Sequence, residues 1–203
     1  MPRAAKVRVD HDEIRGRILA VAEEMFRRVG YQKTAVADIA AALSMSPANV
    51  YRFFPSKSAI SEAICQRVVD EIVDIAWSFV RRQGTAAERI QAMLVTLFRH
   101  NRDTMFKERR VHDMVSAALE ERWPVIKEHL ARLTTIIESL IREGIDAGEF
   151  EVNDPQCAAE CVKVGFAAFL HPVLIEQNLE DDAEIKARVQ AGFLVDALRP
   201  RAR

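Results

Sequence analysis

The chain has 203 residues and 49% of them are hydrophobic, which is enough to bury one large core or two small ones. Seven glycines and seven prolines are too few for a turn-rich β architecture, and a net charge of −1 excludes a polycation that coats nucleic acid. Three cysteines do not make a disulfide framework.

The sequence also favours a protein that stays inside the cell. The N-terminal stretch MPRAAKVRV lacks the apolar core of an export signal. The longest apolar-rich run, residues 157–175, is interrupted by Glu160, Lys163, His171 and Pro172, so it does not suit a membrane span. We therefore expect a soluble, cytoplasmic protein. Cys157 and Cys161 lie one helical turn apart, a spacing that favours packing over bridging.

The first predicted helix runs from near His11 to Val29. One face of it is apolar and the opposite face is charged. Gly30 is expected to close it.

Two short helices are predicted next. Apolar residues at helical spacing indicate the first of them over residues 36–43, and residues 44–46 supply a turn. Ser46 can cap a second helix that starts at Pro47, where the missing N–H costs nothing, and Pro55 stops that helix. The pair has the form of a helix-turn-helix that reads DNA.

The second short helix is expected to have a buried side and a polar side. Its apolar residues Val50, Phe53 and Phe54 can face inward, which leaves Ala48, Asn49, Tyr51 and Arg52 facing out. Amide, phenol and guanidinium groups bond base edges and phosphates, so this face is a candidate DNA-reading surface.

The rest of the chain also reads as helix. A long helix opens at Lys57 or Ser58 and ends near Gly84, and further helices are expected over residues 86–101, 109–121, 123–147, 155–170 and 183–198. The expected fold is all-α with nine helices. An N-terminal head, residues 1–57, would hold the helix-turn-helix, and a C-terminal bundle, residues 58–203, would bind a ligand and dimerise.

Charge is distributed unevenly between these parts. Residues 1–60 hold ten Lys and Arg against six Asp and Glu, whereas the remainder holds nineteen against twenty-four. A basic front and an acidic back fit a DNA-facing module attached to a body that stays off the DNA, although an ordinary fluctuation of surface charge gives the same numbers.

The last two long helices suggest a partner subunit. The helix at 155–170 carries many small residues, which let another helix approach closely, and the final helix adds an apolar stripe. Burial inside a monomeric core is the alternative. Because paired recognition helices must reach successive major grooves, we expect a homodimer.

The chain resembles the tetracycline-repressor (TetR) family of bacterial transcription regulators. The resemblance runs from about Ile14 to Ser61 and rests on the segment ILAVAEEMFRRVGYQKTAVADIAAALSMSPANVYRFFPSK. It implies that Thr34, Tyr51 and Lys57 contact phosphates and that Ser46, Ala48, Asn49 and Arg52 face the major groove. Relatives often carry tyrosine and histidine where this chain has Arg52 and Phe53.

The resemblance also implies a ligand pocket in the body. The lining residues we expect are Phe98, Phe106, His112, Met114, Trp123, Phe169 and His171. An effector that is largely apolar with one polar end would suit them. Convergence of His112, His129 and His171 on a metal ion is a further reading, but their spacing is not a metal motif, so we expect no metal and no cofactor.

These observations predict a ligand-responsive regulator that binds a double-stranded DNA operator. A repressor released by a small-molecule effector is favoured, and an activator would use the same parts. The alternatives are a helical protein-interaction scaffold and a helical enzyme. No nucleophile elbow, glycine-rich phosphate loop or metal signature supports an enzyme.

Overall fold

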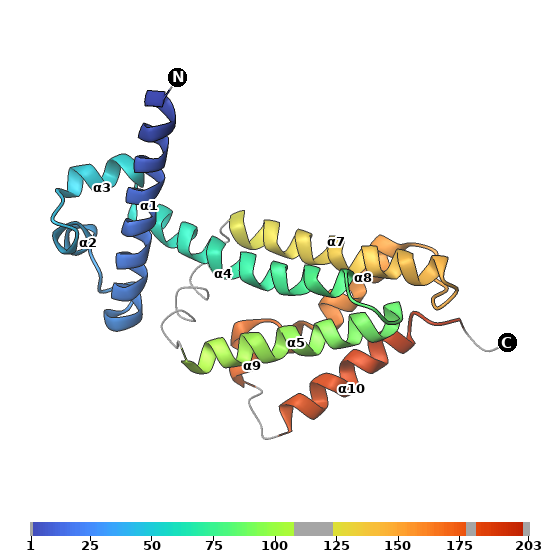
Figure 1. Cartoon of the computed structure of the whole chain (residues 1–203). Helices are drawn as coiled ribbons and strands as arrows, with labels where there is room; N and C mark the ends of the chain where they lie inside the picture. The colour runs from blue at the N-terminus through green and yellow to red at the C-terminus, as the bar shows by residue number, and fades with distance from the viewer. Residues whose placement is uncertain (1, 108–123, 178–181, 201–203) are drawn as a thin grey trace. The chain divides into compact units, whose positions relative to one another are not determined.

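The computed structural model describes residues 2–107, 124–177 and 182–200, and their side chains from residue 11 onward except 105–107. All regular structure in these residues is helical, which confirms the predicted all-α fold (Figure 1). The chain divides into two compact units, one reaching up to Arg67 and the other starting at Val68. This boundary falls inside α4 (Lys57–Val80).

The first unit contains the predicted helix-turn-helix. Its described residues form α1 (Pro2–Val29), α2 (Val36–Ala42), α3 (Pro47–Phe53) and the start of α4. Its core is formed by apolar side chains from all four helices, namely Ile18, Ala22, Phe26, Ile39, Val50, Phe54, Ile60 and Ile64. The helix α1 begins at Pro2 rather than near His11, because residues 3–8 are mostly good helix formers that extend an existing helix at little cost.

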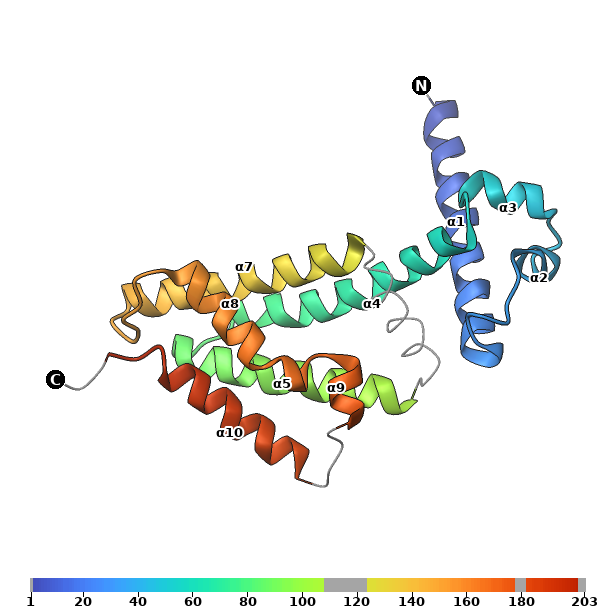
Figure 2. The same cartoon turned by 180° about the vertical axis from the view of Figure 1, so that it is seen from behind.

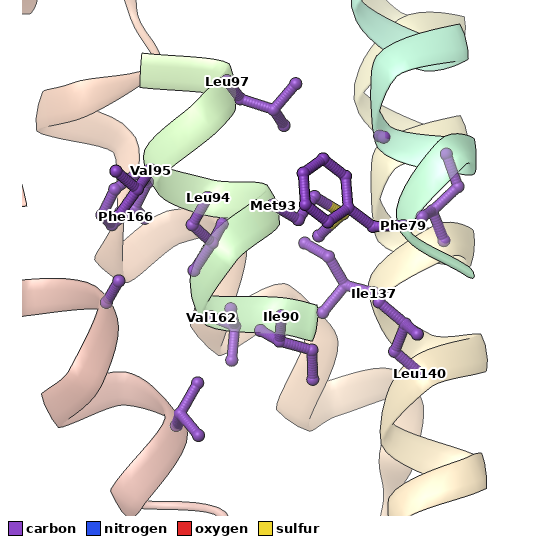
Figure 3. Close-up of a cluster of buried hydrophobic side chains, with 14 of the residues drawn as sticks. Phe79, Ile90, Met93, Leu94, Val95, Leu97, Ile137, Leu140, Val162 and Phe166 are labelled. Carbon is purple, nitrogen blue, oxygen red and sulfur yellow. The ribbon is translucent and has the colours of Figure 1, made fainter. Parts of the chain in front are cut away.

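The second unit is a bundle built around α5 (Ala86–Lys107). This helix contacts α7 (Pro124–Asp146), α9 (Pro172–Gln177) and α10 (Ala183–Asp196). The remaining long helix, α8 (Pro155–Gly165), packs against α7. Figure 2 shows the same bundle from behind, with α10 alongside α5. In its core Phe79, Met93 and Ile137 point toward one another from α4, α5 and α7 (Figure 3).

The turn between α4 and α5 is held to α7 and to the loop after it by two polar side chains, the buried Arg89 and the half-buried Glu149. Arg89 is only 5% exposed; it donates to the Val80 carbonyl at 3.0 Å and forms an ion pair of 2.5 Å with Glu143 on α7. The Glu149 carboxylate accepts from the backbone N–H groups of Ala86 and Ala87, both at 3.0 Å. These bonds satisfy donors at the start of α5 that the helix itself leaves unpaired.

The predicted helix over residues 155–170 is confirmed up to Gly165 and is wrong in residues 166–170. The helix α8 ends at Gly165, and a short 3₁₀ turn (Ala167–Phe169) and α9 follow. Glycine weakens a helix, and the residue before Pro172 avoids helical geometry, so the apolar run folds as turns. The predicted helix over residues 109–121 lies outside the described residues.

Two further expectations concern membranes and thiols. Within the described ranges, no helix is both long and apolar enough to cross a lipid bilayer. The three cysteines are free; Cys65 is buried, whereas Cys157 and Cys161 are exposed on α8. The two thiols interact with each other at the surface of α8 and are not part of the buried core among the described residues.

Candidate nucleic-acid interface

The helix α3 starts as its sequence predicts. The Ser46 hydroxyl accepts from the Asn49 N–H at 3.2 Å, and Pro47 occupies the first turn. Before it, Ser44 adopts a φ of 55°, the left-handed conformation that lets the chain reverse between α2 and α3. These local features set α3 across the end of α2 as a separate, capped helix.

The two sides of α3 differ as expected. Val50 and Phe54 are fully buried and Phe53 is only half-buried, whereas Ala48, Tyr51 and Arg52 are exposed and Asn49 is half-buried. The Tyr51 ring is 48% exposed, so it is not buried under α4. The outward side of α3 therefore presents a phenol, a guanidinium and an amide on one short helix.

The C-terminal end of α3 is held by α1, through a residue that the sequence interpretation missed. Arg15 donates to the Phe53 carbonyl at 2.9 Å, and its guanidinium lies 4.1 Å from the centre of the Phe54 ring. The His11 ring also packs against Phe53, with ring centres 4.7 Å apart. A signal for Arg15 existed, because it continues the buried stripe of Ile18 and Leu19 one turn earlier.

The loop before α2 is closed by Thr34. Gly30 ends α1 with a φ of 97°, as its position predicted, and the Thr34 hydroxyl donates to the Gly30 carbonyl at 2.9 Å. Thr34 is only 4% exposed. The hydroxyl therefore already donates its hydrogen inside the protein. Thr34 can donate to a phosphate only if its hydrogen bond to the Gly30 carbonyl breaks.

Lys57, the first residue of α4, lies against the same loop. Its Nζ donates to the Gln32 carbonyl at 3.3 Å and sits 4.4 Å from the centre of the Tyr31 ring. Partial burial lowers the pKa of this lysine below its usual value. The ammonium group is thus held beside the helix-turn-helix instead of moving freely in solvent.

In the body, the structure brings together only some of the expected pocket residues. Phe98 is buried and contacts the half-buried Phe169 edge to face, with ring centres 5.6 Å apart. His171 follows the same 3₁₀ turn and is half-buried. Phe106 belongs to α5 but its side chain is not described, and His112, Met114 and Trp123 lie outside the described residues.

His129, which the sequence analysis considered as a metal ligand, is a half-buried polar residue of the body. Burial lowers its pKa to about 4, and the positive charges of Arg132 and Lys163 act in the same direction, while Asp70 opposes them. Its Nδ1 is buried and has no hydrogen-bond partner among the described residues. In the same residues, no group of three or more His, Cys, Asp or Glu side chains is arranged to hold a metal ion.

An exposed apolar surface crosses α8 and α10. Four large side chains are each about two-thirds exposed, at 65–69%, namely Val164, Ile185, Val189 and Phe193. The three on α10 are spaced by four residues and so form one stripe. The two helices meet at Gly165, whose carbonyl accepts from Gln190 at 3.1 Å. We refer to these four residues as the α8–α10 face.

Comparison with protein families covers both units. Residues 18–64 match the family "Bacterial regulatory proteins, tetR family", and residues 86–191, just over half of the chain, match "Tetracyclin repressor-like, C-terminal domain". The first match contains the whole helix-turn-helix and Lys57, and the second contains most of the bundle.

Individual proteins agree with these matches. The transcriptional activator FasR of Mycolicibacterium smegmatis is 31% identical over 91 residues, which is 45% of this chain and 42% of FasR, so the chain matches less than half of that relative. A TetR/AcrR-family regulator from Thermobifida fusca is 26% identical, with a TM-score of 0.64 over 93% of this chain and 100% of the other. A regulator from Pectobacterium atrosepticum has a TM-score of 0.73 at 18% identity, over 97% and 99% of the two chains. The chain therefore belongs to the TetR family, a family of DNA-binding transcription regulators.

Proposed function

We propose that this protein is a homodimeric repressor that binds a double-stranded DNA operator and is released from it by a small-molecule effector. The observation that carries the proposal is the outward side of α3. It presents Tyr51 and Arg52 to solvent on a capped helix whose other side is buried in the first unit. A recognition helix in the major groove needs this combination of a rigid base and a polar outer side.

The residue roles follow from the chemistry of each side chain. Asn49 can pair with an adenine edge, and Arg52 can reach a guanine or the backbone. Tyr51 and Lys57 would donate to phosphates. Ser46 and Ala48 would face the major groove of the DNA. Thr34 would donate to a phosphate only after its hydrogen bond to the Gly30 carbonyl breaks.

The α8–α10 face supports the homodimer. A monomer that leaves four large apolar side chains in water loses the free energy of burying them, and a second copy of the same face would cover them about a two-fold axis. Two subunits would then offer two recognition helices to one operator.

We also keep the proposed division into a DNA-binding head, residues 1–57, and a ligand-binding and dimerising body, residues 58–203.

The effector would bind in the body. Phe98 and Phe169 offer apolar surface, and His171, two residues after Phe169, offers a half-buried polar group. Phe106, His112, Met114 and Trp123 complete the proposed lining. The effector must prefer the body conformation in which the two heads no longer fit the operator.

FasR is named an activator, and the same coupling would serve an activator if the effector favoured the DNA-bound state.

Two other classes have less support. A protein-interaction scaffold would use the α8–α10 face, but it gives no task to the polar side of α3. An enzyme would need a set of acid, base or nucleophile groups held together, and we propose that the chain is not one.

Footprinting of the purified protein on genomic DNA tests the proposal. We expect a protected site with two related half-sites, and binding that weakens steeply as salt is raised. Lys127→Ala, which changes an exposed lysine of α7, is a control expected to bind normally. No protection at any sequence in moderate salt would rule out the repressor and leave the scaffold.

A further inference from the structure

Two contacts from one loop hold the side chain of Lys57. Its Nζ lies 3.3 Å from the Gln32 carbonyl oxygen and 4.4 Å from the centre of the Tyr31 ring. Lysine side chains on a surface usually occupy many rotamers and lose that freedom when they bind a partner. The side chain of Lys57 is therefore already restricted to few rotamers in the protein without DNA.

The Tyr31 ring is itself fixed in the first unit. It meets the ring of Phe26 edge to face, with centres 5.5 Å apart and planes at 90°, and Phe26 is almost completely buried. The loop around Tyr31 is closed by the bond from Thr34 to Gly30. The ring therefore offers the ammonium group a defined surface, because its own position is set by the core.

The electrostatics of this arrangement favour a charged lysine. Burial lowers the pKa of Lys57, whereas the negative face of an aromatic ring and a carbonyl oxygen both stabilise the ammonium form. The Gln32 carbonyl takes one of the three N–H donors of an ammonium group. Two donors remain that can turn toward phosphate oxygens.

We propose that Tyr31 is a positioning residue for DNA binding, whose ring holds the Lys57 ammonium group where the DNA backbone passes. This inference rests on the proposed phosphate contact of Lys57. Tyr31 acts through Lys57, so it changes affinity for every DNA sequence alike and adds no preference among bases.

The test is a double-mutant cycle measured by DNA-binding titrations at several salt concentrations, with operator and with unrelated duplex. Tyr31→Leu keeps an apolar side chain against Phe26 but removes the ring, and we expect it to weaken both complexes about two- to fivefold. Tyr31→Phe restores the affinity, because it keeps the ring face. In a Lys57→Ala background, Tyr31→Leu has no further effect.

Lys33→Ala provides the matched control, because it removes an exposed lysine from the same loop. In that background Tyr31→Leu keeps its full effect. Should Tyr31→Leu fail to fold, Tyr31→Trp gives the reverse test, since tryptophan binds cations most strongly and binding is expected to tighten.

The outcomes separate this inference from the proposed function. An equal loss from Tyr31→Leu with and without Lys57 would show that Tyr31 only maintains the loop, which overturns the inference while the phosphate contact of Lys57 stands. Unchanged affinity and salt dependence in Lys57→Ala would overturn the contact itself, and the inference with it.

Discussion

At the scale of single residues, two cations of the first unit are each held by an aromatic ring and a backbone carbonyl. Arg15 lies over Phe54 and donates to Phe53, and Lys57 lies over Tyr31 and donates to Gln32. Arginine keeps its charge at any physiological pH, and its carbonyl bond occupies an otherwise unpaired acceptor at the end of α3. One cation thus fixes the C-terminal end of α3, and the other is fixed beside the loop before α2.

Asn49 is the residue from which we expect base discrimination. Asn49→Ala should relax preference at particular base pairs, at a cost of about 1–3 kcal/mol on the operator and little on unrelated DNA. Competition binding against a library of single-base operator variants measures this directly. A preference profile identical to that of the unaltered protein would remove Asn49 from the set of reading residues.

His129 makes the stability of the body depend on pH. Its pKa is about 4 in the folded protein, against an ordinary value of 6.5, so the unfolded chain binds more protons between these values. We expect the free energy of unfolding to fall as pH is lowered from 6.5 to about 4 and the His129 contribution to level off below that. Denaturant titrations at several pH values should show that the free energy of unfolding of His129→Gln varies less with pH. If it varies with pH as much as in the unaltered protein, other groups cause the effect.

At the scale of elements, local signals predicted the head and failed at one place in the body. The helix α3 was predictable because its cap, its first-turn proline and its apolar positions all lie within a few residues. The end of α8 at Gly165 was not, because the apolar residues after it suit a helix or a buried turn equally well. Arg15 was overlooked for a related reason, since its partner Phe53 is 38 residues away.

The turn after α7 depends on a glycine for close packing. A Cβ on Gly144 would lie 2.2 Å from the Phe150 ring and 3.0 Å from Ala86. Because Phe150 is buried, its ring cannot move aside freely, and we expect Gly144→Ala to destabilise the body by about 1–3 kcal/mol. Thermal unfolding measures the loss. Gly16→Ala is the control, because a Cβ there meets nothing within 4 Å and should leave the melting temperature unchanged or higher.

At the scale of the whole molecule, a small residue of α8 allows close packing within a single chain. We expected the small residues of 155–170 to let a partner helix approach closely. At one of them, Gly165, the close approach is made by Leu194 of the same chain, whose side chain would lie 2.7 Å from an added Cβ. A substitution at Gly165 would therefore disturb the monomer first. The exposed stripe of α10 is the better place to test the dimer.

Phe193→Arg provides that test. The ring is 69% exposed, so the substitution should leave the fold intact while placing a charge in the proposed interface. We expect a monomer in sedimentation and a large loss of operator affinity. Leu130→Arg, at an exposed leucine of α7, should remain dimeric. If the unaltered protein sediments as a monomer at micromolar concentration and still binds the operator, the dimer proposal fails.

The α8–α10 face and α3 belong to different compact units, and this division has a genetic consequence. A subunit that carries an inactive α3 keeps an intact α8–α10 face, so it would still pair with normal subunits. Each mixed pair would have one working recognition helix and would lose most of its hold on a two-half-site operator. Mutations in the head are therefore expected to be dominant when both forms are made in one cell, whereas mutations such as Phe193→Arg are expected to be recessive, because the altered subunits never enter a pair.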